Sequence, residues 1–250
     1  MLANFSGRRK IGYPLLADPD VEIIKTFGIV NTSVPEDNPL YGFSYAGYYM
    51  TDAQGVVVSK FFNERNNDRF TSANILVREL GADAGDIQGQ VETDHLVLRW
   101  SASNAYLRPG QRIVLTLEVE PKPGMHVYSP AVEGGYIPIT WDLDPPPAIE
   151  VFEAEFPEAE ELFLEAIEET LPVYGTPFKI LRDIRAEGAR VFHDALIGKD
   201  GIVVEGLFRY QACDDLQCFF PLEIPLRWDL ELKPHDLIRV PEELQRRPQP

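Results

Sequence analysis

The sequence contains few residues of the kinds that bind metals. Its 250 residues include 2 cysteines and 4 histidines. A structural zinc site takes four ligands from Cys and His, usually at short paired spacings. The histidines show no such spacing: they are His95, His126, His193 and His235. A zinc-stabilised domain is therefore a weak alternative, and we expect neither a metal nor another bound cofactor.

Basic charge is also scarce, with 23 Lys and Arg against 40 Asp and Glu and a net charge of -17. Such a chain repels a phosphate backbone or an anionic membrane surface, and no cluster of basic residues offsets the repulsion. We therefore expect no nucleic acid among the partners.

Long hydrophobic runs are missing too. The longest, such as residues 55–62, are far shorter than the roughly 20 residues of a membrane span. The opening MLANFSGRRKIGYPLLADPD has no apolar core after its basic residues, so no export signal is recognisable. We expect no direct membrane insertion, and a cytoplasmic location if Met1 is the true start.

What is present is the composition of a folded globular protein, with 44% hydrophobic and 25% charged residues. The stretch GADAGDIQGQVETD is small and polar and separates two parts of different texture. We predict an α+β chain of two domains. The predicted segments are a first domain at 1–80, a linker at 81–91, a second domain at 92–233 and a polar tail at 234–250.

The first part has α/β character. The segment ADPDVEIIKTFGIV predicts a helix with Val21, Ile24 and Phe27 on one face. The segment YAGYYMTDAQGVVVSKFF predicts two strands joined by a turn at 52–55, and DRFTSANILVREL predicts a closing helix.

The second part has β character. Apolar and polar residues alternate in RIVLTLEVE and LEIPLRWDLEL, which is typical of half-buried strands, and MHVYSP, FKILRDIRAE and KDGIVVEGLFRYQAC add further strands. Short strands between Pro and Gly turns predict an antiparallel β-sandwich. Residues 150–169 are rich in glutamate, and ELFLEAIEE within them predicts a helix by propensity alone. We interpret this run as a solvated face rather than an acidic binding surface.

The two cysteines lie in YQACDDLQCFFP, as Cys213 and Cys218. A disulfide closing so short a loop contributes only about 2 kcal/mol, so stabilisation is a poor reason for the pair. A short loop also resists reopening little, which favours a bond that forms and breaks. Asp214 and Asp215 oppose a thiolate by their charge. The residues favour thiol exchange and leave an inert pair as the alternative.

The run VEGLFRYQACDDLQCFFPLEIPL resembles the signature strand of the amino-terminal domain of the DsbD family of thiol:disulfide interchange proteins, and PGMHVYSP and LPVYG resemble its other site segments. The resemblance covers residues 92–233. It implies an immunoglobulin-like sandwich, a mainly extended acidic segment, and a periplasmic relay of electrons between DsbD-type and thioredoxin-like proteins. It also implies Cys218 as attacker and Cys213 as resolver. The site-lining residues that it implies are His126, Tyr128, Val173, Tyr174, Gly175, Tyr210 and Gln211.

The chain departs from the family pattern in three ways. The cysteine spacing is one residue shorter than in the best-known members, His126 stands where an aromatic residue is usual, and Val173 replaces a bulky residue of the cap loop. For Tyr128, Tyr174 and Tyr210, a place in the ordinary core and a direct redox role both stay open, because buried tyrosines are common wherever the hydroxyl finds a partner.

Residues 1–80 resemble the later half of a peroxiredoxin-like redoxin of the thioredoxin superfamily, through IGYPLLADPD, FGIVN and YAGYYMTDAQGVVVSKFF. They hold no cysteine, and Ala46 stands where that family has its cis-proline. We expect no thiol peroxidase activity and, since Met1 falls within the fold, a start inside a longer gene. The chain is thus expected to exchange disulfides through Cys213 and Cys218. The alternative is a non-catalytic sandwich that docks partners and carries an inert cysteine pair.

Overall fold

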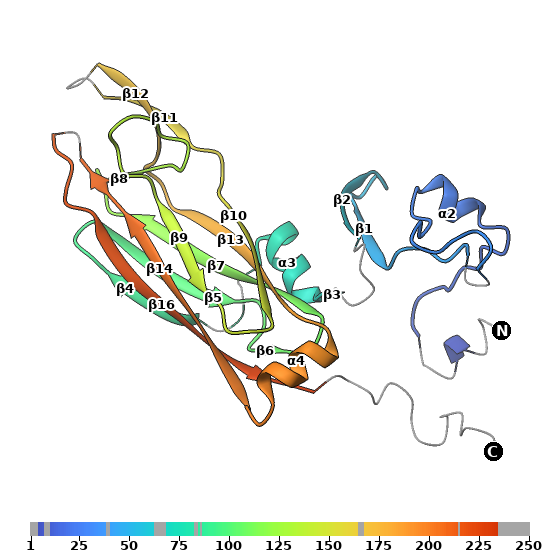
Figure 1. Ribbon diagram of the computed structural model, residues 1–250. Coiled ribbons are helices and arrows are strands. Elements are labelled where there is room, and N and C mark those ends of the chain that lie inside the picture. Colours follow the sequence, from blue (N-terminus) through green and yellow to red (C-terminus); the bar gives the residue numbers. More distant parts are fainter. Residues whose placement is uncertain are drawn as a thin grey trace. The chain divides into compact units, whose positions relative to one another are not determined.

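The computed structural model describes the following residues: 5–7, 11–38, 41–62, 69–82, 85, 87–164, 168–214 and 216–234. The chain divides into two compact units, Met1–Asn66 and Asn67–Pro250, which are described separately (Figure 1). Within the described residues, no helix has the length and apolar character that crossing a membrane requires. His235 and the rest of the predicted tail beyond Pro234 lie outside the described residues.

In its described residues the first unit has a hairpin and helix α2, and residues 5–7 are also helical. Helix α2 (Glu22–Thr26) buries none of its residues. Strands β1 (Gly47–Thr51) and β2 (Val57–Phe62) pair antiparallel. The turn between them is held by the Asp52 carboxylate, which accepts hydrogen bonds from the backbone N–H groups of Gln54 and Val56, each at 2.9 Å. The predicted hairpin with its turn at 52–55 is confirmed. The predicted helix is confirmed only over Glu22–Thr26, with Val21 and Phe27 as its caps and not on a helical face. The redoxin resemblance stays a prediction.

The second unit begins before its sandwich strands. Strand β3 (Arg69–Phe70) pairs in parallel with strand β7 (Gln111–Pro121), and helix α3 (Ser72–Leu80) follows. The Thr71 hydroxyl caps α3 by accepting from the Asn74 N–H, which is the usual arrangement at a helix start. Val77 packs on Val114 of β7. The predicted helix is confirmed. Because α3 packs on the sandwich, the two units divide before α3, between Asn66 and Asn67. The linker predicted at 81–91 lies after α3.

The described part of the second unit consists mostly of antiparallel sheet. One sheet has the order β10-β13-β7-β5-β4, and a second has the order β6-β16-β14-β9, in which β6 is parallel to β16 (Figure 1). The strands of the first sheet, besides β7, are β4 (Ile87–Glu92), β5 (Leu96–Ala102), β10 (Ile149–Glu155) and β13 (Phe178–Ala186). Those of the second are β6 (Tyr106–Leu107), β9 (Thr140–Asp144), β14 (Gly201–Tyr210) and β16 (Leu222–Leu232).

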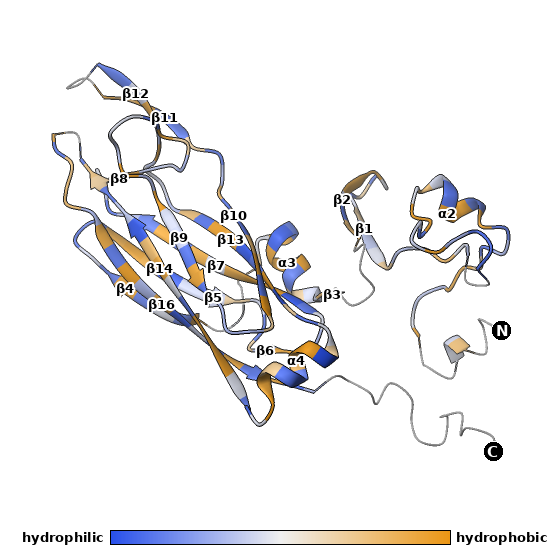
Figure 2. Ribbon diagram, in the orientation of Figure 1, coloured by the Kyte–Doolittle hydropathy of each residue, from blue (hydrophilic) through white to orange (hydrophobic). Residues whose placement is uncertain are grey.

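A single apolar core lies between these two sheets. In β16, Ile224, Leu226, Trp228 and Leu230 are buried and alternate with exposed residues, as predicted. Figure 2 shows hydrophobic and hydrophilic colours alternating along strands of the two sheets. Leu115 and Leu117 of β7 belong to the same core cluster, as does Phe208 of β14. The indole N–H of Trp228 donates to the Ser101 carbonyl oxygen at 2.9 Å, across the two sheets. The sheets therefore pack face to face as a β-sandwich.

The acidic segment is extended, not helical. It forms β11 (Glu160–Leu164) and β12 (Glu169–Tyr174), which pair antiparallel and join a third sheet of order β11-β12-β8-β15. The helix expected from propensity is therefore wrong where the structure describes the segment, and residues 165–167 lie outside that part. The physical reason is tertiary: Leu162 and Leu171 face one another across the hairpin, and both pack in a cluster around Tyr128.

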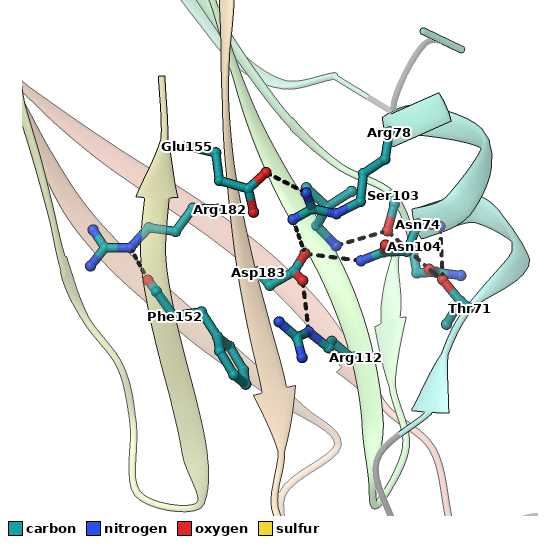
Figure 3. A network of polar contacts seen from close by, with 11 residues as sticks. Thr71, Asn74, Arg78, Ser103, Asn104, Arg112, Phe152, Glu155, Arg182 and Asp183 are labelled. Carbon is teal, nitrogen blue, oxygen red and sulfur yellow. Dashed lines mark hydrogen bonds and ion pairs between the residues drawn. The ribbon is translucent and has the colours of Figure 1, made fainter. Parts of the chain in front are cut away.

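Two features of the second unit were not predicted. Helix α4 (Ala189–Leu196) closes one end of the sandwich and buries Phe192 and Leu196. A polar network joins α3 to the first sheet (Figure 3). In it, buried Asp183 accepts from Arg78 at 2.8 Å, from Arg112 at 2.6 Å and from Asn74 at 3.0 Å. The network fixes α3 on the sandwich, because a buried carboxylate needs these partners.

Candidate functional site

The two cysteines form a disulfide beside the third sheet. Cys213 ends β15 (Ala212–Cys213), which pairs with β8 (His126–Tyr128), so that Cys213 lies opposite His126. Five positions later the chain returns, and the Cα atoms of Cys213 and Cys218 are 4.1 Å apart. The pair therefore lies at the end of one strand and in the loop that follows it.

Backbone hydrogen bonds hold this loop in shape. The Asp214 carboxylate accepts from the N–H groups of Leu216 and Gln217, each at 2.8 Å, and the Asp214 N–H donates to the Gln217 carbonyl at 2.9 Å. These two N–H donors lower the pKa of Asp214, and the charge of His126 adds to the effect. The carboxylate is therefore ionised and directed at the loop backbone. Asp215, its expected companion beside the thiols, lies outside the described residues.

Gln211 and Phe219 fasten the two sides of the loop. The Phe219 N–H donates to the Ala212 carbonyl at 2.8 Å, and the Gln211 side-chain amide donates to the Phe219 carbonyl at 3.0 Å. The Gln211 side chain thus supports the loop by binding the backbone of Phe219. Among the described residues, no hydrogen bond joins Gln211 to a sulfur.

The two sulfur-bearing residues differ in access to solvent. Cys213 is 1% exposed, whereas Cys218 is exposed. Cys213 packs in a small cluster with Tyr128, Leu171 and Val173. An incoming reagent therefore reaches Cys218 first.

Tyr128 is a polar residue in contact with both sulfurs. Its hydroxyl oxygen is 3.2 Å from the sulfur of Cys213 and 3.2 Å from that of Cys218. A disulfide sulfur carries no hydrogen, so the hydroxyl is the donor in the oxidised state. Burial raises the pKa of Tyr128, and the negative charge of Glu169 raises it further. The hydroxyl therefore keeps its hydrogen at neutral pH.

The β11–β12 hairpin covers this buried side of the disulfide. Val173 of β12 pairs with Tyr128 of β8, and both side chains are buried with Cys213. Gly175 follows β12 and is exposed. Val173 and Leu171 thus supply an apolar cover over Cys213 from the hairpin.

Tyr136 is a site residue that the sequence did not indicate. Its ring lies 4.9 Å from the ring of Tyr128, centroid to centroid, and its hydroxyl donates to the Glu169 carboxylate at 2.6 Å. That hydrogen bond raises the pKa of Tyr136 to about 12. Tyr136 belongs to no motif, and its partner is 33 positions away, so no sequence pattern pointed to this pair.

Tyr174 and Tyr210 belong to the main core. The Tyr174 hydroxyl donates to the Pro157 carbonyl at 2.8 Å, and the Tyr210 hydroxyl lies 2.8 Å from that of Thr93. Burial raises the pKa of each tyrosine. The structure thus places Tyr128 and Val173 with Cys213 in one cluster, and Tyr174 and Tyr210 in the sandwich core. His126 lies opposite Cys213 on the neighbouring strand.

The groups in contact with the two sulfurs are the Tyr128 hydroxyl and apolar side chains. In the part of the chain that the structure describes, no group of three or more His, Cys, Asp and Glu side chains is arranged to hold a metal ion. The groups at the two sulfurs offer the chemistry of a disulfide with one accessible sulfur and a hydroxyl within hydrogen-bond distance of both.

One comparison with known proteins identifies a family. The sequence model of the family described as "Thiol:disulfide interchange protein DsbD, N-terminal" matches residues 93–224. Among solved structures, the N-terminal periplasmic domain of ScsB from Proteus mirabilis is similar, with 12% identity and a TM-score of 0.39. That match covers 58% of this chain and 51% of the other, so the chain spans about half the length of the solved domain. The search of curated proteins gave no match.

Proposed function

Because this chain belongs to the family of the DsbD amino-terminal domain, we propose that Cys213 and Cys218 are a redox-active pair that exchanges electrons with a thioredoxin-like partner. The second unit then serves as an immunoglobulin-like scaffold for one disulfide. The reaction class is thiol:disulfide exchange, and it requires no bound cofactor.

The observation that carries the proposal is the different surroundings of the two sulfurs. Cys218 is exposed, Cys213 is 1% exposed, and the Tyr128 hydroxyl lies 3.2 Å from both sulfurs. A purely structural disulfide needs neither an accessible sulfur nor a shared hydroxyl. Exchange needs a sulfur that a partner can reach and a means of stabilising the sulfur that leaves.

The first step is attack by a partner thiolate on the sulfur of Cys218. A bond forms between the partner sulfur and Cys218, the bond between Cys218 and Cys213 breaks, and its electron pair leaves with Cys213. The Cys213 thiolate forms where water has little access, so the Tyr128 hydroxyl is its available hydrogen-bond donor at 3.2 Å.

The second step releases the partner. Its second thiolate attacks its own bridged sulfur and forms a disulfide within the partner, and Cys218 leaves as a thiolate. Two electrons and, after both sulfurs take up protons, two protons have then passed from the partner to this chain. In the opposite direction, the Cys218 thiolate attacks a partner disulfide and Cys213 resolves the mixed disulfide.

The proposed setting follows from the family. A DsbD-type or thioredoxin-like protein supplies or receives the electrons, in the periplasm. A disulfide that closes so short a loop adds little to the stability of the fold, and by linkage the fold stabilises this disulfide equally little. We therefore expect a reduction potential above the roughly -300 mV typical of structural disulfides.

A redox titration tests the proposed function. The protein is equilibrated in glutathione or dithiothreitol buffers of graded potential, and alkylated thiols are counted by mass spectrometry. We expect a reversible two-electron transition of Cys213 and Cys218 within the buffered range. A disulfide that stays closed throughout would support an inert pair in a docking module.

A further inference from the structure

Two large apolar side chains stand in the solvent beside the exposed sulfur. Leu216 and Phe220 are each 91% exposed, and they lie two residues before and two residues after Cys218. Apolar side chains scattered singly over a surface need no explanation, but two that bracket a reactive sulfur form a local group.

Hydrogen bonds hold the backbone beside each of these side chains. The Leu216 N–H is bonded to the Asp214 carboxylate at 2.8 Å, so the backbone of this residue is held while its side chain faces water. On the other side, the Phe219 N–H and carbonyl are both bonded, to Ala212 and to Gln211. The backbone at Leu216 and Phe219 is therefore held by hydrogen bonds, and covering the exposed side chains of Leu216 and Phe220 costs mainly their own rotamer freedom.

We propose that Leu216 and Phe220 form the docking surface for the thioredoxin-like partner and determine its reactivity toward Cys218. The inference rests on the proposed function and goes beyond it, because it assigns partner selection to two residues that do not take part in the sulfur chemistry.

Geometry requires a protein partner to cover both residues. A mixed disulfide places the partner sulfur about 2 Å from that of Cys218. Each of Leu216 and Phe220 has its Cα atom within about 8 Å of the Cys218 Cα, since consecutive Cα atoms are about 3.8 Å apart. Even a transient redox interface, of up to about 600 Å² on each side, extends well beyond that radius. A partner that reaches Cys218 therefore cannot avoid these two side chains.

The character of the pair indicates what the partner presents. Leu and Phe are covered favourably by an apolar surface, and apolar anchors near the centre of an interface carry much of its affinity. The matching partner is thus a thioredoxin-like protein with apolar residues around its own reactive cysteine. A small dithiol has no such surface, and it reaches the sulfur of Cys218 without covering its neighbours.

The test compares a protein reductant with a small one. Reduction of the disulfide is followed in the full chain and in Leu216→Ser/Phe220→Ser, with reduced thioredoxin and with dithiothreitol. We expect the double substitution to lower the second-order rate constant for thioredoxin about tenfold or more, because two interface anchors are lost. The rate with dithiothreitol should stay within about twofold, since the sulfur chemistry is untouched.

Ile197→Ser is the matched control. Ile197 is 70% exposed and follows α4, at the opposite end of the sandwich from β8 and β12 (Figure 1). It should react with both reductants as the unsubstituted chain does.

The outcomes separate the docking surface from the proposed function. A double variant that thioredoxin reduces at the original rate overturns the docking surface, and so does an equal loss with both reductants. Reduction of the original chain by dithiothreitol but not by thioredoxin overturns the class of partner. A disulfide that neither reductant opens overturns the proposed function, and the docking surface with it.

Discussion

The Tyr128 hydroxyl is the polar contact that the two sulfurs share. It lies 3.2 Å from each of them, and burial keeps it protonated by raising its pKa. A hydrogen bond to a charged group contributes about 1.5–3 kcal/mol, more than one between neutral groups. The hydroxyl therefore stabilises a Cys213 thiolate more than it stabilises the closed disulfide.

Replacing this hydroxyl should slow the opening of the disulfide. We expect Tyr128→Phe to lower the rate of reduction by dithiothreitol about tenfold, because each 1.4 kcal/mol lost from the transition state is a factor of ten. The rate is measured by quenching with an alkylating reagent at timed intervals. The control is Tyr174→Phe, which removes a hydroxyl bonded to the Pro157 carbonyl in the main core. Equal rates for Tyr128→Phe and the unsubstituted chain would contradict a role for the hydroxyl.

Some of the site residues could be predicted from short motifs, and others depended on the fold. Cys213 and Cys218 are only five positions apart in sequence, so their approach needed only a tight turn. Val173 and Tyr174 were expected together, but consecutive residues of a strand face opposite sides, so Val173 joins the cysteine cluster and Tyr174 the main core. Tyr136 reaches the site from a separate loop, and no local pattern encodes that contact.

At the scale of elements, the β11–β12 hairpin ties the acidic segment to the site. Glu169, at the start of β12, accepts the hydrogen bond of Tyr136, which comes from the loop after β8. Local propensity favoured a helix here, whereas cross-strand pairing and burial of Leu162 and Leu171 favour the strands. Propensity is a weak signal where tertiary contacts decide, so this element could not be predicted from its own residues.

The hydrogen bond from Tyr136 to Glu169 predicts how the pKa of Tyr136 responds to a substitution at Glu169. The pKa of Tyr136 is raised to about 12 because the Glu169 carboxylate accepts its hydrogen bond. The folded pKa exceeds the ordinary value, so the contribution of this bond to stability is full below about pH 10 and is lost as the pH rises through about 12. We expect Glu169→Gln to return the pKa of Tyr136 toward 10. The measurement is the ultraviolet absorbance of tyrosinate, taken as the difference from Tyr136→Phe. A pKa unchanged by Glu169→Gln would show that the bond is absent in solution.

The ion pair between Arg78 of α3 and Asp183 predicts that removing the arginine lowers the stability of the unit. Arg78 and Arg112 both bond Asp183, whose side chain is 2% exposed, so removing one arginine leaves the buried carboxylate with fewer partners. We expect Arg78→Ala to lower the free energy of unfolding by about 2–3 kcal/mol, somewhat below the loss for a buried charge left with no partner. Urea denaturation measures it.

An exposed ion pair supplies the comparison. The side chains of Arg227 and Asp229 are 57% and 64% exposed, and Arg227→Ala should change the free energy of unfolding by less than about 1 kcal/mol. Equal effects of Arg78→Ala and Arg227→Ala would contradict the structural role of the Asp183 network.

At the scale of the whole molecule, the second unit contains every residue of the candidate site. The compact unit Asn67–Pro250 includes α3, the sandwich and the disulfide. The sandwich could be predicted from alternation along strands such as β16. The place where the units divide could not, because α3 follows the first unit in sequence while its contacts are with β7 and β13.

A fragment beginning at Asn67 should therefore keep the stability and the redox behaviour of the unit. We expect its urea midpoint, and its rate of reduction by dithiothreitol, to match those of the full chain. A fragment beginning at residue 82 loses Arg78 and Val77 and should unfold at lower urea, because Asp183 and Val114 lose partners. Equal midpoints for both fragments would show that α3 contributes nothing to the unit.

Trapping of a mixed disulfide tests most directly that Cys218 is the sulfur that reacts with a partner. Cys213→Ser and Cys218→Ser are each incubated with an oxidised thioredoxin-like protein and resolved on non-reducing gels. The exposed Cys218 should attack and, with the resolving thiol absent, stay bound, so Cys213→Ser should accumulate the mixed disulfide. Cys218→Ser retains the sulfur that is 1% exposed and should trap little. Stronger trapping by Cys218→Ser would reverse the roles of the two cysteines, and no trapping by either variant would contradict disulfide exchange itself.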